Sequence, residues 1–191
     1  MKTERAPWFK FSNANLEIGN FGNEGTIPKS VSCKGMKAKI SGSVILRDEV
    51  KGNLILDDLV VEQNVIIEGK MQGLIHENNC EIGGFTFLPK NNLEAEFVAR
   101  DSTMKGIHFL NGENPFELID LEGSEFEYLF FRERLRELIL KNTKVTRKCE
   151  LSSECLSLKP EISLDGFWAA EFNKKSRKIC RVMRNDRPRS K

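Results

Sequence analysis

AKISGSVILRDEVKGNLILDDLVVEQNVIIEGKMQGLIHENNCEIGGF, residues 38–85, carries a large apolar residue at almost every fifth position. From Ile40 to Phe85 this spacing gives nine apolar residues among ten, whereas a chain that is 39% hydrophobic predicts about four. A helix repeats its apolar positions every three to four residues, and a strand every two. A period near five, with Gly, Asn and Asp between the centres, instead indicates short extended segments wound into a coil.

The same period extends on both sides of this stretch. Matching units are ANLEI (14–18), NNLEA (91–95), STMKG (102–106), IDLEG (119–123) and SEFEY (124–128). Each has a large apolar centre, which is commonly preceded by Asn or Asp. We expect the centres to point toward the axis of the coil: Leu16, Phe21, Ile40, Ile45, Val50, Leu54, Leu59, Val65, Met71, Cys80, Phe85, Leu93, Val98, Met104, Phe109, Phe116, Leu121, Phe126, Phe131, Leu140, Val145, Leu151, Leu156 and Leu164.

These units resemble the pentapeptide-repeat family, whose motif is approximately A(D/N)LxG, over most of residues 14–165. The resemblance implies an all-β fold, a right-handed parallel β-helix with a quadrilateral section. Coils of about 20 residues would stack at roughly 4.8 Å, so six or seven coils are expected. Phe-rich centres from 85 to 131 would form an aromatic column inside. Residues 41–69 are also similar to bactofilins, which form a three-sided β-helix and polymerise end to end. The apolar runs within residues 44–67 of this chain require some apolar side chains to point outward.

Two segments depart from the repeat. Residues 130–142 place apolar side chains at helical spacing between alternating charges, which favours a short inserted helix over a strand with its arginines outward. Residues 167–183 have an apolar side surrounded by Lys and Arg, which predicts a helix that caps the last coil. The predicted division is therefore a β-helix domain over 1–166 and a basic helix and tail over 167–191.

Composition excludes several classes of protein. The chain has 191 residues, 30% of them charged, and a mean hydropathy of −0.40, which is typical of one globular domain. No apolar run is long enough to cross a membrane, and the start MKTERAPWFKF does not resemble a signal peptide. Five scattered cysteines, an odd number, indicate a reducing compartment, so we predict a cytoplasmic protein.

Charge is unevenly distributed along the chain. Residues 61–131 have 4 basic and 13 acidic side chains, whereas residues 132–191 have 17 basic and 8 acidic ones. Such blocks bind partners of opposite charge or simply form solvated faces. The candidate partner-binding residues are the acidic Glu113, Glu117, Asp120, Glu122, Glu125 and Glu127, and the C-terminal Trp168, Phe172, Lys174, Lys175, Arg177 and Lys178.

The sequence offers little for catalysis. His76 and His108 lie within repeat units, without a nearby nucleophile in a known motif, so both are expected on outward faces of the coil. Cys149 and Cys155 have no zinc-site spacing and are expected to be buried apolar residues. A left-handed β-helix acyltransferase has a similar composition, but its six-residue period is met only briefly. We therefore expect no enzymatic activity, cofactor or metal.

The predicted function is a rigid scaffold that presents a charged face and an outward apolar strip to protein partners or to copies of itself, as a dimer or end to end. One alternative follows from the resemblance, because some pentapeptide-repeat proteins imitate the charge of DNA and occupy topoisomerases such as gyrase. A second alternative is a bactofilin-like polymer. The tail from Lys174 to Lys191, with nine Lys or Arg and one Asp, predicts non-specific contact with nucleic acid.

Overall fold

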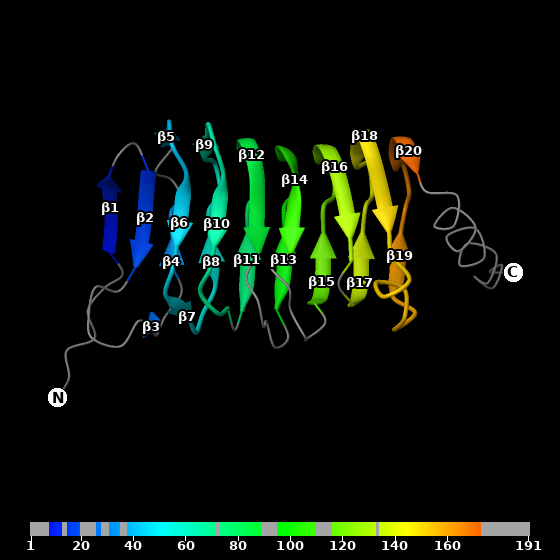
Figure 1. The fold of residues 1–191 in the computed structure, drawn as a ribbon, viewed down its shortest axis with the longest axis horizontal. Coiled ribbons are helices and arrows are strands. Elements are labelled where there is room, and N and C mark those ends of the chain that lie inside the picture. Colours follow the sequence, from blue (N-terminus) through cyan, green and yellow to red (C-terminus); the bar gives the residue numbers. More distant parts are fainter. Residues whose placement is uncertain are drawn as a thin grey trace, which may run out of the picture.

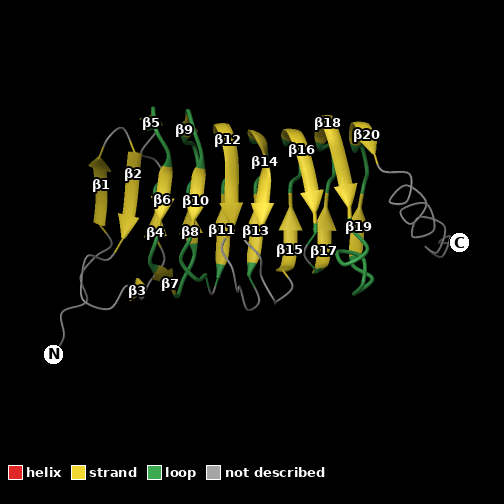
Figure 2. Ribbon diagram, in the orientation of Figure 1, coloured by secondary structure: helices red, strands yellow, loops and turns green. Residues whose placement is uncertain are grey.

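The structure is a computed structural model, and it describes residues 8–12, 15–19, 26–27, 31–34, 38–71, 73–88, 95–109, 116–132 and 134–172. These residues form a parallel β-solenoid of about six turns. Successive coils follow one another along the long axis of the molecule (Figure 1). Figure 2 shows strands and loops, and no helix, over the described residues.

The strands belong to three sheets. An eleven-stranded sheet contains β1 (Trp8–Ser12), β2 (Asn15–Gly19), β5 (Lys39–Ile40), β6 (Val44–Leu46), β9 (Val60–Val61), β10 (Val65–Ile67), β12 (Glu81–Leu88), β14 (Thr103–Phe109), β16 (Glu125–Phe131), β18 (Lys144–Leu151) and β20 (Trp168–Phe172). A seven-stranded sheet contains β4 (Val31–Ser32), β8 (Leu54–Ile55), β11 (Leu74–His76), β13 (Glu96–Val98), β15 (Phe116–Asp120), β17 (Leu135–Ile139) and β19 (Glu161–Ser163). The third sheet pairs β3 (Thr26–Ile27) with β7 (Glu49–Val50).

The first described coil is long, because Leu16 pairs with Val44, 28 positions on, and the coils that follow are shorter. Val44 pairs with Val65 and Val65 with Thr86, 21 positions apart in each case, while later coils vary from 19 positions (Glu125 with Lys144) to 24 (Lys144 with Trp168). Each strand therefore satisfies its backbone groups through the coils before and after it. The expected period of about 20 residues per coil is confirmed.

The N-terminal end is built differently. β1 runs antiparallel to β2, with Phe9 opposite Ile18, whereas every other described strand pairing is parallel. An antiparallel hairpin occupies the edge of β2 that would otherwise receive another parallel coil.

Most predicted centres form the core. Apolar side chains point inward at stacked positions, and buried centres include Leu16, Ile40, Val50, Leu54, Leu59, Val65, Met71, Cys80, Met104, Phe116, Leu121, Phe126, Phe131, Leu140, Val145, Leu151 and Leu164. The predictions for Ile45 and Phe85 are wrong, because both lie half-buried on strand positions that alternate with buried ones. Phe21 and Leu93 lie outside the described residues.

At one corner of the solenoid, residues with a left-handed backbone conformation stack in a column. Its members repeat once per coil and have positive φ: Asp58 (61°), Asn79 (53°), Asp101 (51°), Gly123 (73°), Asn142 (54°) and Gly166 (70°). Asn, Asp and Gly tolerate this conformation best, which explains why they recur between the apolar centres. Buried hydroxyls follow this corner: the Cys80 amide donates to Ser102 Oγ at 3.0 Å, and the Ser102 amide to Ser124 Oγ at 2.9 Å.

The helix predicted over 130–142 is wrong. Phe130 and Phe131 end β16, and β17 follows from Leu135 to Ile139, where it pairs with β15 and β19. Pairing on both sides outweighs the local preference for helix. The capping helix predicted over 167–183 is not found at its start, because Trp168–Phe172 is strand β20, paired with β18; residues 173–183 lie outside the described residues.

Candidate functional site

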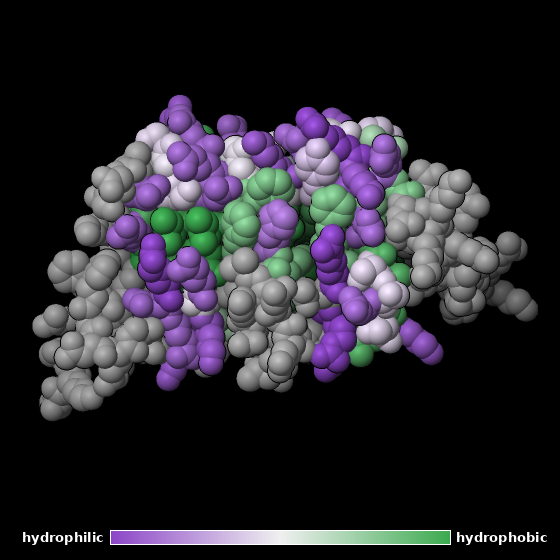
Figure 3. Space-filling model, viewed as in Figure 1, coloured by the Kyte–Doolittle hydropathy of each residue, from purple (hydrophilic) through white to green (hydrophobic). Residues whose placement is uncertain are grey.

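A strip of apolar and aromatic side chains crosses the outer face of the eleven-stranded sheet. Register places Ile45, Ile66, Phe87 and His108 on four successive strands. All are half-buried except His108, which is exposed. Figure 3 shows apolar surface in a band along this side of the solenoid. We call this set the outward strip: Ile45, Ile66, Phe85, Phe87, His108, Tyr128 and Phe130.

The rings of the outward strip contact one another between and within coils. Phe87 and His108 stack with centroids 5.2 Å apart and planes at 16°, and Phe85 lies 4.7 Å from the same His108 ring. Tyr128 and Phe130 stack at 6.0 Å and 20°. Such pairs contribute about 0.5–1.5 kcal/mol each beyond their buried area. The rings are thus held in fixed positions before any partner arrives.

Two basic side chains of the next coil, Arg147 and Lys148, lie over aromatic rings of the strip. The Arg147 guanidinium lies 5.4 Å from the Tyr128 ring centroid, and Arg147 Nη1 donates to the Tyr128 hydroxyl at 2.8 Å. Lys148 Nζ lies 5.8 Å from the Phe130 centroid. Cation–π contacts of this kind orient long basic side chains over aromatic surface.

The acidic candidates mostly face basic residues of the following coil. Four ion pairs have N–O distances of 3.0 to 3.2 Å: Glu117–Arg136, Glu122–Lys141, Glu125–Lys144 and Glu127–Arg147. The acidic and basic blocks of the sequence are therefore stacked on each other rather than separated. Exposed pairs contribute little to stability, but each one neutralises the charge of an acidic candidate.

The remaining acidic candidates differ from these four. Asp120 is fully buried and accepts a hydrogen bond from Arg100 Nε at 2.9 Å. That carboxylate raises the pKa of Arg100, because its hydrogen bond and its charge both favour the guanidinium. Glu113 lies outside the described residues.

The C-terminal candidates are only partly described. Trp168, the first residue of β20, is 52% exposed, whereas Phe172 packs against the core and makes an edge contact with Phe167 at 5.6 Å. Lys174, Lys175, Arg177 and Lys178 lie outside the described residues. Trp168 therefore remains the apolar candidate with the greatest exposure at this end.

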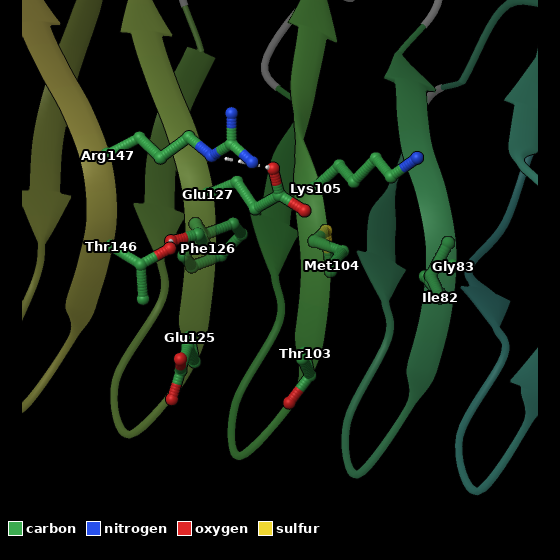
Figure 4. Close-up of a pocket in the computed structure, with 10 residues that line it drawn as sticks. All are labelled: Ile82, Gly83, Thr103, Met104, Lys105, Glu125, Phe126, Glu127, Thr146 and Arg147. Carbon is green, nitrogen blue, oxygen red and sulfur yellow. Dashed lines mark hydrogen bonds and ion pairs between the residues drawn. The ribbon is translucent and has the colours of Figure 1, made fainter.

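A shallow groove of about 450 Å³ borders the outward strip (Figure 4). Buried Ile82, Met104 and Phe126 form its floor, and the Glu127–Arg147 ion pair lies along one wall. Gly83 also lines the groove, and a Cβ at this position would lie 2.3 Å from the backbone oxygen of Glu62. Its lining offers charged and hydroxyl groups to a partner but, within the described residues, no nucleophile paired with a base.

Histidine and cysteine lie where the sequence indicates. His76 is on the outer side, with Nδ1 3.1 Å from Asp57 Oδ1, and His108 belongs to the outward strip. Cys149 and Cys155 are buried, as expected. Burial also raises the pKa of the Cys33 and Cys80 thiols to about 12, so neither thiol is a ready nucleophile or ligand at neutral pH.

The sequence indicated the apolar start of the outward strip but missed its aromatic part. Runs over 44–67 required outward apolar side chains, and Ile45 and Ile66 fulfil this. The period of five instead places Phe85 in an inner aromatic column, although Thr86 is the residue that points inward. Strict alternation over Phe85-Thr86-Phe87 was the available signal.

A scan against protein-family models found no match, and neither the curated proteins nor the solved structures yielded one. Among the described residues, none forms a helix of the length and apolar character needed to span a membrane. Arguments about function therefore rest on the solenoid and its surface.

Proposed function

We propose that this protein is a non-enzymatic scaffold, a stiff β-solenoid that binds a protein partner through the outward strip. The observation that carries the proposal is the alignment of Ile45, Ile66, Phe87 and His108 on four successive strands, together with the stacked rings of Tyr128 and Phe130 on β16. Inward side chains already supply the core, so the strip is not needed to fill it. Aromatic side chains fixed in place dominate the energetics of many protein interfaces, and contiguous apolar surface is commonly an interaction site.

We further propose that the solenoid has a quadrilateral section and a right-handed sense. Consecutive strands β6, β7, β8 and β9 pair with β10, Met71, β11 and β12 of the next coil, which supports a quadrilateral section with four short sides. The right-handed sense and the relation to pentapeptide repeats are proposed from the resemblance of the units. A quadrilateral rod displays the strip on one side, which gives a partner a straight surface.

Affinity capture with cross-linking mass spectrometry tests this function. The strip variant Phe87→Ser/Phe130→Ser is compared with wild type and with Lys39→Ala, a control on the same sheet whose side chain is exposed. We expect wild type and the control to capture the same protein, with cross-links at Lys105 and Lys148 beside the strip. If the strip variant captures that protein equally well, the strip is not the binding surface.

A further inference from the structure

Two polar residues interrupt otherwise apolar columns inside the solenoid. Glu77 belongs to a buried column with one member in each coil: Leu56, Glu77, Ala99, Leu121, Leu140 and Leu164. Backbone hydrogen bonds connect the coils at these positions; for example, the Glu77 N–H donates to the carbonyl of Val98, the residue before Ala99. Thr86 occupies the column Leu16, Val44, Val65, Thr86 and Ile107. Both polar side chains are fully buried. They belong to one coil and meet in its interior.

The carboxyl group of Glu77 is incompletely satisfied. Thr86 Oγ1 donates to Glu77 Oε2 at 2.9 Å. Glu77 Oε1 is buried and has no hydrogen-bond partner among the described residues. An ionised carboxylate at this place would bury its charge against one neutral donor, which costs far more than burying the neutral acid.

Within the described part of the chain, no Lys or Arg forms a hydrogen bond or an ion pair with Glu77. Cys80, on the same coil, is a neutral thiol whose pKa is raised by burial and by the charge of Glu77. On the outer side of the coil, Asp57 pairs with His76. Burial raises the pKa of Glu77 to about 8, against an ordinary value of 4.5, and the hydrogen bond from Thr86 opposes this only in part.

We propose that the Glu77–Thr86 pair is a pH-sensitive latch, which holds its coil closed most tightly in acid and loosens it as the pH rises toward neutrality. When the coil opens, Glu77 meets water and ionises near its ordinary pKa of 4.5, whereas in the closed coil it keeps its proton to about pH 8. Opening therefore releases a proton between these values and becomes easier by about tenfold per pH unit. Above about pH 8 both states are ionised, and the effect levels off.

The response is expected to be local. Strands β8 and β13 flank this coil on the seven-stranded sheet, and β10 and β14 flank it on the eleven-stranded sheet. Each coil contacts only its neighbours, so one coil can loosen while distant coils stay stacked. The latch thus acts on the strand that carries Phe85 and Phe87 of the outward strip.

Hydrogen exchange of the full chain between pH 5 and pH 9 tests the latch, with rates corrected for intrinsic exchange. The comparison is with Glu77→Gln, which keeps an acceptor for Thr86 but cannot ionise. Relative to this variant, peptides over 74–88 of the wild type should lose protection about tenfold per pH unit from about pH 5 to 8, while peptides over 135–151 do not change. Equal pH profiles for the two proteins over 74–88 would overturn the proposal.

A measurement on the wild type alone guards against a variant that folds poorly. With glutamate labelled at its carboxyl carbon, NMR should resolve one resonance that titrates near pH 8, well above all others. A second variant, Glu77→Leu, introduces the residue found at position 56 of the same column and should be equally insensitive to pH. If every glutamate resonance titrates below about pH 6, the latch does not exist.

Discussion

Replacing Phe126 with Ala tests whether the inward columns hold the solenoid together. Phe126 is 1% exposed and lies between Met104 of the preceding coil and Val145 of the following one. It is among the three largest fully buried side chains described, with Phe97 and Phe131. A cavity left here can collapse only in part, because the coils on both sides fix the neighbouring backbone.

The expected loss follows from the buried area. A buried Phe removes about 150–250 Å² from water, and about 25 cal/mol per Å² gives roughly 4–6 kcal/mol for the whole side chain. Alanine retains part of this, and the remaining cavity adds a cost, so Phe126→Ala should lower the free energy of unfolding by about 3–5 kcal/mol.

Urea unfolding followed by circular dichroism measures the loss. Two controls lie on the same strand: Phe130→Ala removes a half-buried ring of the outward strip, and Glu125→Ala breaks the exposed ion pair with Lys144. Phe130→Ala should cost clearly less than Phe126→Ala, and Glu125→Ala should cost about 0–1 kcal/mol. If Phe126→Ala costs under about 1 kcal/mol, or no more than Phe130→Ala, the inward assignment is wrong.

Three further outcomes are expected. The wild type should not inhibit DNA supercoiling by gyrase at low salt, because Glu122 and Glu125 are already paired with lysines; inhibition that Glu122→Lys/Glu125→Lys removes would instead establish the DNA-mimic alternative. Thiol reagents at pH 8 should label Cys33 and Cys80 only after denaturation, since burial raises both pKa values to about 12; mass spectrometry of the native protein would reveal any exception. Gly123→Ala should destabilise the fold by at least about 1–2 kcal/mol in thermal unfolding, because φ is 73° there and a Cβ would lie 2.3 Å from Asp101 Oδ1; an unchanged melting temperature would contradict this.

The repeat made the solenoid predictable, because every coil must stack its apolar centres and its backbone groups on those of its neighbours. Leu54, Val65 and Leu121 are inward since a period near five brings each apolar centre to the axis once per side. Asn79 and Asp101 mark the corner for an equally local reason, their tolerance of positive φ. Where sequence period and local preference agree, the fold could be deduced without coordinates.

Prediction failed where partners distant in sequence decide the outcome. Leu135–Ile139 has helical spacing, yet it is strand because β15 and β19 supply hydrogen bonds on both sides. The same applies to the candidate site: Glu127 and Arg147 are 20 positions apart, and only the coil length brings them to 3.2 Å. A one-residue uncertainty in that length moves a side chain from one face to the other, which is why the period of five predicts Phe85 inward although it points outward.

The nearest-neighbour stacking of the coils has a mechanical consequence. Tension applied at the two ends would load the hydrogen bonds of the terminal coil first, because none of the described strands pairs with a distant coil. That coil would peel away before the next one bears the load, so extension should proceed in discrete steps. A coil of 21 residues, at about 3.4 Å per residue, releases about 70 Å of chain in each step. The molecule would thus extend by unfolding one coil after another rather than by elastic stretching of the whole solenoid.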